Sequence, residues 1–255
     1  MFFAEDTQLP VDFCFDGRNA VKVMMVITKG ETGGAQSHVL SLCSALRAQV
    51  EFEAAIGGPE TVTPLGVGLA ALGVPVHSLS SMRNTLSPTR VIAAVLSLIR
   101  LLREKRPDIV HAHSAVAGVI ARIAGAILKI PVIYTVHGFG FKPEVPRLQR
   151  WASWIAEFSL APLTSRMICV SEYEGILARR LPLAQGALRV IRNGVADSEA
   201  RAEPWLEPVR IAMVARLAPP KRADLLLEAL ALLKDQTGSE ISATLLGDGP
   251  ERQVL

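Results

Sequence analysis

The sequence predicts an α/β fold built around a parallel β-sheet. Short apolar runs alternate with amphipathic stretches along most of the chain, and half of the 255 residues are apolar. Runs such as 21–27 and 132–136 are apolar at nearly every position, which is typical of strands buried on both faces. Because parallel strands are joined by crossover helices, the alternation predicts helices on both faces of the sheet.

The expected strands are short and end at turn residues or at the start of a helix. The second one, 51–56, stops at Gly57-Gly58-Pro59, a combination that breaks both strands and helices. In order along the chain, the expected strands are 21–27, 51–56, 74–79, 109–113, 132–136, 167–170 and 188–192.

The expected helices fall between these strands. The clearest one starts at Ser87-Pro88, because proline is favoured at the first helical position, and it stops before Pro107. Apolar side chains between Val91 and Leu102 recur on one face of it. The other expected helices are 35–48, 65–72, 116–128, 147–160 and 172–180.

These elements suggest two domains of unequal extent. Residues 1–20 read as a loose leader, and 21–194 form one Rossmann-like domain. The segment 195–208 is acidic and contains proline, which is typical of a linker. A second strand–helix series occupies 209–255, with strands at 209–215 and 241–246 and a helix at 221–234. Two strands and one helix cannot bury both faces of a sheet, so we expect this second Rossmann-like domain to be incomplete.

Composition excludes several classes of protein. The formal net charge is +3 with both signs interspersed, so nothing calls for a nucleic-acid partner. The three cysteines, Cys14, Cys43 and Cys169, lack metal-ligand spacing and predict buried thiols in a reducing cytoplasm. The N-terminus lacks the features of a signal peptide, and charges interrupt the apolar stretches 91–102 and 115–133. We therefore expect a cytoplasmic protein that is soluble or peripheral to the membrane.

Unusual residues gather where the expected strands end, which is where open parallel sheets bind ligands. After the first strand, Gly33-Gly34 precedes a helix and offers backbone N–H groups that a phosphate or sugar hydroxyl can approach. The alternative is a tight turn that needs a positive φ angle, and for an isolated glycine pair we favour that alternative. His38 follows on the helix, where a solvated or hydrogen-bonded histidine is the commoner role.

Three further histidines lie at the ends of two successive expected strands. His111 and His113 alternate along one strand, so both point to one face, either as the lining of a cleft or as exposed residues at a strand end. No cysteine or aspartate cluster accompanies them, so a metal site is not indicated. His137 lies in Thr135-Val136-His137-Gly138, and its flanking glycine leaves room for a ligand. An imidazole with its ordinary pKa suits proton sharing near neutrality, although a structural role is nearly as common.

The strongest chemical signal is the turn from Arg216 to Lys221. Arginine offers a planar fork to phosphate oxygens, and a lysine at a helix start adds a point charge to the positive end of the helix. Solvated surface cations are the alternative. Ser171, by contrast, is fully explained as the N-cap of the helix that follows it.

Taken in order, these residues resemble glycosyltransferase family 4, whose members have the GT-B fold of two facing Rossmann-like domains. Seven motifs between about Val21 and Glu251 carry the resemblance. They are Gly33-Gly34-Ala35-Gln36-x-His38, 107–113, Thr135-Val136-His137-Gly138, 168–172, 190–195, Arg216-Leu217-x-x-x-Lys221 and Gly247-Asp248-Gly249-Pro250.

The resemblance implies a function and roles for individual residues. A sugar would pass from a nucleotide-sugar, typically a UDP-sugar, to a lipid-linked or polysaccharide acceptor with retention of configuration, without a metal or other cofactor. Arg216 and Lys221 would stabilise the donor diphosphate, which the Gly33-Gly34 loop would also approach. His137 would be the catalytic residue beside the transferred sugar, and His113 and His38 would lie on the acceptor side.

Family members continue into a Glu-x7-Glu segment that contacts the donor, and the 255 residues contain none. We therefore expect a truncated glycosyltransferase with a complete acceptor domain, working at the inner face of the cytoplasmic membrane. Its basic helix near 89–106 is a candidate contact with anionic lipid. The alternatives are a catalytically inactive binding or assembly module, a gene remnant, and, less favoured, a sugar-nucleotide epimerase of related fold.

Overall fold

The computed structural model describes residues 20–58, 62–83, 87–143, 145–195, 197, 203, 209–219, 221–238 and 241–255. All but the last residue of the expected leader and most of the expected linker lie outside these residues, as does Cys14. The chain divides into two compact units, 1–194 and 195–255. Each unit is described by itself.

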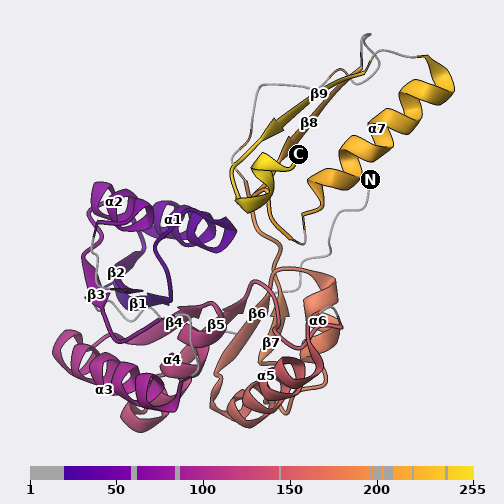
Figure 1. The fold of residues 1–255 in the computed structure, drawn as a ribbon. Helices are drawn as coiled ribbons and strands as arrows, with labels where there is room; N and C mark the ends of the chain where they lie inside the picture. The colour runs from indigo at the N-terminus through magenta and orange to yellow at the C-terminus, as the bar shows by residue number, and fades with distance from the viewer. Residues whose placement is uncertain are drawn as a thin grey trace, which may run out of the picture. The chain divides into compact units, whose positions relative to one another are not determined.

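The first unit is built on a seven-stranded sheet in which all neighbouring strands are parallel (Figure 1). The order is β3-β2-β1-β4-β5-β6-β7. Its strands are β1 (Val21–Ile27), β2 (Val50–Gly57), β3 (Val76–Leu79), β4 (Ile109–His113), β5 (Val132–Val136), β6 (Arg166–Cys169) and β7 (Leu188–Val190). The predicted α/β fold with a parallel sheet is confirmed.

Helices cover the sheet on both faces (Figure 1). They are α1 (Gly34–Leu46), α2 (Pro64–Ala71), α3 (Pro88–Lys105), α4 (Ala115–Leu128), α5 (Arg147–Leu160) and α6 (Glu172–Ala178). A short 3₁₀ turn, Ala161–Leu163, follows α5. Alternate residues of β1 pack into two separate hydrophobic cores, one on each face of the sheet, because successive strand side chains point to opposite faces. Met24 packs with α3 and α4, whereas Met25 packs with α1 and α2.

The strand order fixes where a ligand can bind. β1 lies between β2 and β4, so the connection after β1 runs toward one edge of the sheet and the connection after β4 runs toward the other. Such a reversal leaves a crevice outside the carboxyl ends of the two strands, and open α/β sheets bind their ligands there. Ile27 and His113 are paired at that point.

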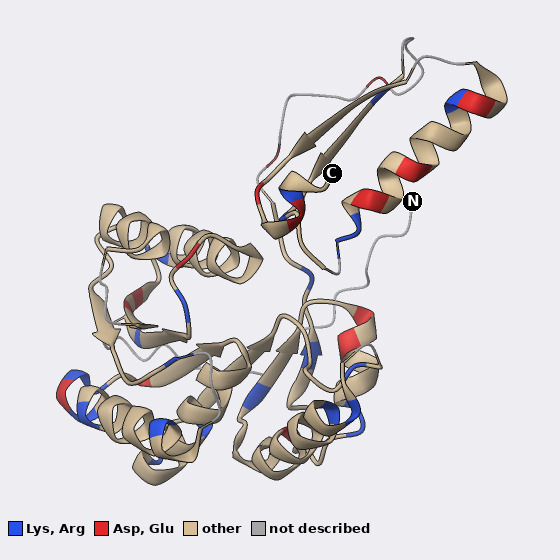
Figure 2. Ribbon diagram, viewed as in Figure 1, with Lys and Arg blue, Asp and Glu red and all other residues tan. Residues whose placement is uncertain are grey.

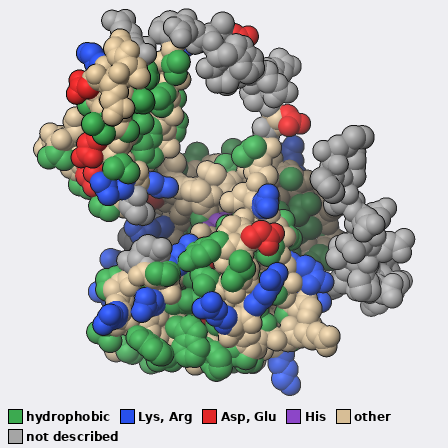
Figure 3. Space-filling view, turned by 90° about the vertical axis from the view of Figure 1, so that its right-hand side faces the viewer, with side chains coloured by type: hydrophobic (Ala, Val, Ile, Leu, Met, Phe, Trp, Pro, Cys, Tyr) green, Lys and Arg blue, Asp and Glu red, His purple; other side chains and the backbone are tan. Residues whose placement is uncertain are grey.

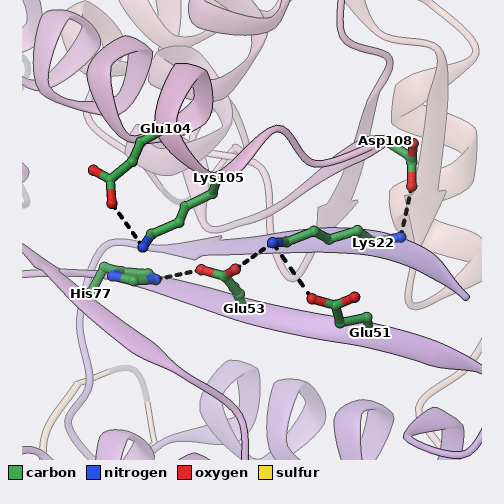
Figure 4. A network of polar contacts seen from close by, with 7 residues as sticks. All are labelled: Lys22, Glu51, Glu53, His77, Glu104, Lys105 and Asp108. Carbon is green, nitrogen blue, oxygen red and sulfur yellow. Dashed lines mark hydrogen bonds and ion pairs between the residues drawn. The ribbon is translucent and has the colours of Figure 1, made fainter. Parts of the chain in front are cut away.

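A polar network occupies the β1–β3 part of the sheet toward its amino end (Figure 4). Lys22 Nζ lies 2.6 Å from Glu53 Oε1, and His77 Nε2 lies 2.6 Å from Glu53 Oε2. The backbone N–H of Lys22 donates to Asp108 Oδ2 at 2.8 Å, which ties the start of β1 to the residue before β4. Burial raises the pKa of Glu53, but hydrogen bonds from Lys22 and His77 outweigh it, so the net pKa is lowered.

The remaining cysteines behave as predicted from the sequence. Cys43 and Cys169 are buried free thiols. Burial raises the pKa of each thiol to about 12, so both are unreactive. Among the described residues, no helix is both long and apolar enough to cross a bilayer.

The second unit contains two parallel strands, β8 (Arg210–Val214) and β9 (Ser242–Leu246), with α7 (Ala223–Thr237) between them in sequence. The chain then makes a short 3₁₀ turn at Pro250–Gln253. Several apolar side chains of this unit are exposed, as expected for two strands and one helix: Val214, Leu225, Leu232 and Leu246.

Candidate functional site: a histidine cluster at the carboxyl ends of β1, β4 and β5

Four histidines from three elements meet at the predicted crevice. His111 and His113 come from β4, His137 follows β5, and His38 comes from α1. The His113 ring centroid lies 4.3 Å from that of His111, 5.5 Å from that of His137 and 5.6 Å from that of His38. The structure therefore brings together all the histidines that the sequence singled out.

Hydrogen bonds order the cluster. His111 Nε2 lies 2.8 Å from Thr135 Oγ1, and His113 Nδ1 lies 3.2 Å from His137 Nε2. His113 is fully buried, and its Nε2 is without a hydrogen-bond partner among the described residues. The alternative of exposed histidines at a strand end is wrong, because His111 and His113 are both buried. His113 contacts His137 directly and has no solvent-exposed surface of its own.

The cluster is electrically neutral at neutral pH. Burial is the main reason that the pKa of His111 falls to about 3 and that of His137 to about 4. Burial also lowers the pKa of His38 and places that of His113 well below its ordinary value. The expectation that His137 shares protons near neutrality, which used the ordinary imidazole pKa, is therefore wrong. At pH 7 the His137 ring is neutral.

The Gly33-Gly34 pair differs from the turn that we favoured. Gly33 is the N-cap of α1 with φ 178° and ψ 168°, which is an extended conformation open to any residue, and neither glycine has a positive φ. A Cβ on Gly34 would meet no atom within 4 Å, so neither the backbone angle nor crowding requires glycine there. No side chain caps α1, so the first N–H groups of this 13-residue helix are available to an anionic ligand.

A second polar contact supports the crevice between β1 and β4. Thr28 Oγ1 and Ser114 Oγ lie 2.5 Å apart, and the N–H of Ala117 donates to Thr28 Oγ1 at 3.2 Å. Ser114 has φ 82°, a strained conformation of the kind that clusters at functional sites. Its only signal in the sequence was its place directly after His113.

The loop after His137 is held from α6. The buried Glu174 accepts a hydrogen bond from the N–H of Phe139 at 3.2 Å and forms an ion pair with Lys142. Ser171 caps α6 as predicted, accepting from the N–H of Glu174 at 3.3 Å. The spacing Ser171-x-x-Glu174 matches a capping box and would have drawn attention to Glu174, which the sequence reasoning missed.

Arg216 and Lys221 lie in the second unit, and both are exposed. The predicted helix start at Lys221 is wrong: α7 begins at Ala223, because Arg222 adopts a left-handed conformation and pairs with Asp224 at 2.8 Å. Lys221 instead closes a turn, its N–H donating to the carbonyl of Ala218 at 3.0 Å.

The Gly247-Asp248-Gly249 turn packs directly on the loop that carries Arg216. A Cβ on Gly247 would lie 1.8 Å from the carbonyl oxygen of Ala215, so only glycine fits this approach. The N–H of Leu217 donates to the carbonyl of Asp248 at 2.9 Å. Two motifs that are distant in sequence thus form one turn structure.

The cluster is not a preformed metal site. The described part of the chain offers no group of three or more His, Cys, Asp or Glu side chains placed to hold a metal ion.

Comparisons with known proteins place the chain in a family. The family model of Glycosyltransferase Family 4 matches residues 32–199, more than half of the chain, and the chain belongs to this family. The matched segment includes the Gly33-Gly34 pair and all four clustered histidines.

Two curated relatives are similar over different extents. The UDP-Gal:alpha-D-GlcNAc-diphosphoundecaprenol alpha-1,3-galactosyltransferase of Escherichia coli is 34% identical over 118 residues, covering 44% of this chain and 30% of that enzyme. A D-inositol 3-phosphate glycosyltransferase of Mycolicibacterium gilvum is 26% identical over 81% of this chain and 52% of its own length. The chain thus spans about half or less of the length of these relatives.

Solved structures share the fold. Anabaena Alr3699/HepE in complex with UDP and glucose has a TM-score of 0.69 and 20% identity, covering 91% of this chain and 63% of its own. The apo form of the lipopolysaccharide outer core galactosyltransferase WaaB has a TM-score of 0.64 and 19% identity, covering 92% and 63%. The predicted GT-B relationship is confirmed at the level of the fold.

Proposed function

We propose that the protein transfers a sugar from a nucleotide-sugar, most simply a UDP-sugar, to a lipid-linked or polysaccharide acceptor with retention of configuration. The proposal rests on family membership and on one structural observation. A neutral histidine cluster and an open helix start share the carboxyl ends of β1, β4 and β5, inside the segment that the family model matches. The UDP-Gal and diphosphoundecaprenol in the name of the Escherichia coli relative support this choice of donor and acceptor.

In this proposal His137 lies beside the transferred sugar. Its ring is half-buried, and its Nε2 is already engaged by His113, so Nδ1 is the nitrogen left for a sugar hydroxyl. Since its pKa is about 4, it positions the sugar by hydrogen bonding and does not carry charge. His38, which is partly exposed, faces the acceptor side, and His113 supports both rings from behind.

The diphosphate is the other half of the donor. The N–H groups at Gly33-Gly34 would approach it, and Arg216 and Lys221 would offset the negative charge that develops on the leaving group. With these cations in place no metal is required. The histidines, being neutral, would supply none of the positive charge.

The proposal is tested by a donor screen with the purified 255-residue chain. Radiolabelled UDP-galactose, UDP-glucose and UDP-N-acetylglucosamine are offered with an undecaprenyl diphosphate-linked sugar as acceptor, and the label in the lipid phase is measured. Arg216→Ala should abolish transfer. Arg210→Ala is the matched control, because Arg210 is an exposed arginine at the amino end of β8, the strand that Arg216 follows. Release of UDP with an epimerised free sugar would favour an epimerase instead.

A further inference from the structure

Helix α5 turns an apolar stripe toward solvent. Leu148, Trp151, Ile155 and Phe158 are spaced three or four residues apart, so they share one face of the helix, and they are 41–85% exposed. An ordinary surface helix of a soluble domain has the opposite arrangement, with its apolar stripe against the core. An exposed apolar stripe of this kind marks an interaction surface.

The orientation of α5 is fixed by polar contacts on its inner side. The buried Glu157 of α5 pairs with the buried Arg122 of α4 at 2.8 Å, and Tyr134 Oη donates to Glu157 Oε1 at 3.4 Å. Turning the apolar stripe inward would break this ion pair and expose both charges. The stripe is consequently a stable feature of the surface.

A pocket of about 340 Å³ adjoins the stripe. Its lining combines aromatic rings with guanidinium groups, in the set Phe141, Pro143, Arg150, Trp151, Trp154, Leu177 and Arg180. Trp154 meets Trp151 edge-on at 6.0 Å and also stacks on Phe158 of the stripe, with centroids 4.9 Å apart.

The surroundings of the stripe are basic. Arg147, Arg150, Arg179 and Arg180 flank it on α5 and at the end of α6, and none of the four is ion-paired with any described residue. Figure 2 shows the charges on these helices, and in Figure 3, which views the molecule from their side, basic and hydrophobic side chains are interspersed over the lower body.

We propose that this surface, the α5 face (Leu148, Trp151, Ile155 and Phe158 with Arg147, Arg150, Arg179 and Arg180), docks on an anionic lipid bilayer. The apolar stripe would enter the boundary between headgroups and acyl chains, where tryptophan is favoured, and the arginines would contact headgroup phosphates. The inference deepens the proposed function and rests on it for one point, since a lipid-linked acceptor would reach the enzyme at such a surface.

A second copy of the chain fits the α5 face less well than a bilayer does. In a two-fold dimer the same patch meets itself, so the arginines of one copy would face those of the other. Acidic residues of α5 and α6 would offset little of this repulsion between arginines. Glu157 and Glu174 are buried and already paired, which leaves only the exposed Glu172 on these two helices. An anionic surface complements all four arginines at once.

The basic helix α3, which the sequence analysis named as a candidate contact with anionic lipid, is a weaker candidate than the α5 face. Its exposed apolar residues are Ile92 and Leu96, without an aromatic side chain, and its Lys105 is paired with Glu104 at 2.8 Å. Helix α3 therefore serves as the internal control.

The test is co-sedimentation of the 255-residue chain with vesicles of phosphatidylcholine, with and without phosphatidylglycerol, in the absence of any sugar donor. We expect binding only to the anionic vesicles, with a blue shift of tryptophan fluorescence.

The double variant Trp151→Ser/Ile155→Ser should bind about tenfold more weakly or worse. Arg150→Gln/Arg180→Gln should also bind about tenfold more weakly or worse and lose much of the salt dependence. Ile92→Ser/Leu96→Ser should bind as the unaltered chain does.

Equal binding by the α5 variants and the unaltered chain would overturn the proposal, as would loss of binding in the α3 variant or no binding to either vesicle. Conversion of a dimer to a monomer by the α5 variants, without vesicle binding, would overturn it in favour of a second copy. The substituted side chains are exposed, apart from the partly exposed Arg150, and circular dichroism checks that the variants are folded. Because no donor is present, failure here leaves the proposed sugar transfer untouched.

Discussion

Acidification should destabilise the first unit through its neutral histidine cluster, and His111 offers the clearest case. Its pKa is about 3 in the folded chain, whereas an unfolded histidine has an ordinary value of 6.5. Between these values the unfolded state binds the proton and the folded state does not, so stability falls as pH falls below 6.5. Between pH 7 and pH 5 the loss from His111 alone is about 2 kcal/mol, on the order of 1.5 pH units at 1.4 kcal/mol each.

The assay is urea unfolding of the chain at pH 7 and at pH 5. His111→Gln removes the titrating ring but can still hydrogen-bond to Thr135, so the difference in stability between the two pH values should shrink by about 2 kcal/mol. Met25→Leu is the control, because Met25 pairs with His111 across β1 and β4 and does not titrate. The same pH dependence in His111→Gln as in the unaltered chain would refute the reasoning.

Three further outcomes follow from the polar contacts. Glu157→Gln should cost about 3–5 kcal/mol in urea unfolding, because it leaves the buried charge of Arg122 unpaired, whereas the apolar pair Arg122→Met/Glu157→Leu should recover most of that loss. Glu174→Gln should speed amide hydrogen exchange at Phe139, and unchanged exchange would mean that the ion pair does not hold the loop. Glu53→Gln should cost about 1–3 kcal/mol at pH 7, because the pKa of Glu53 is lowered in the folded chain. That cost should diminish as pH falls below about 4.3, and a constant cost would contradict the ion-pair account.

The sequence was sufficient wherever a local pattern decides the structure. The strands at 21–27, 109–113 and 132–136 and the helix at 147–160 have the predicted bounds, because each is a run of one periodicity that ends at a residue of another kind. The start of α7 was mispredicted for the opposite reason: no local sequence pattern indicates the left-handed conformation that Arg222 adopts.

The sequence located the candidate site at the strand ends, but it could not predict which side chains contact one another there or how deeply they are buried. Alternation placed His111 and His113 on one face, yet their burial depends on α1, which carries His38 from a distant part of the chain. The pKa of His137 is lowered mainly by burial of its own ring, which no local sequence pattern indicates. The contact of Glu174 with the loop after His137 is likewise a product of packing between α6 and that loop.

The central claim is that the histidine cluster belongs to a sugar-transfer site, and His137 tests it most directly. Transfer of label from UDP-galactose, or from whichever donor the screen selects, is compared between the unaltered chain, His137→Ala and His77→Ala. His77 is the control because it is a partly buried histidine of the same sheet, bound to Glu53 outside the cluster. We predict that His137→Ala slows transfer about a hundredfold or more while the fold is retained, and that His77→Ala transfers at nearly the unaltered rate. Transfer by a folded His137→Ala at the unaltered rate would contradict the account.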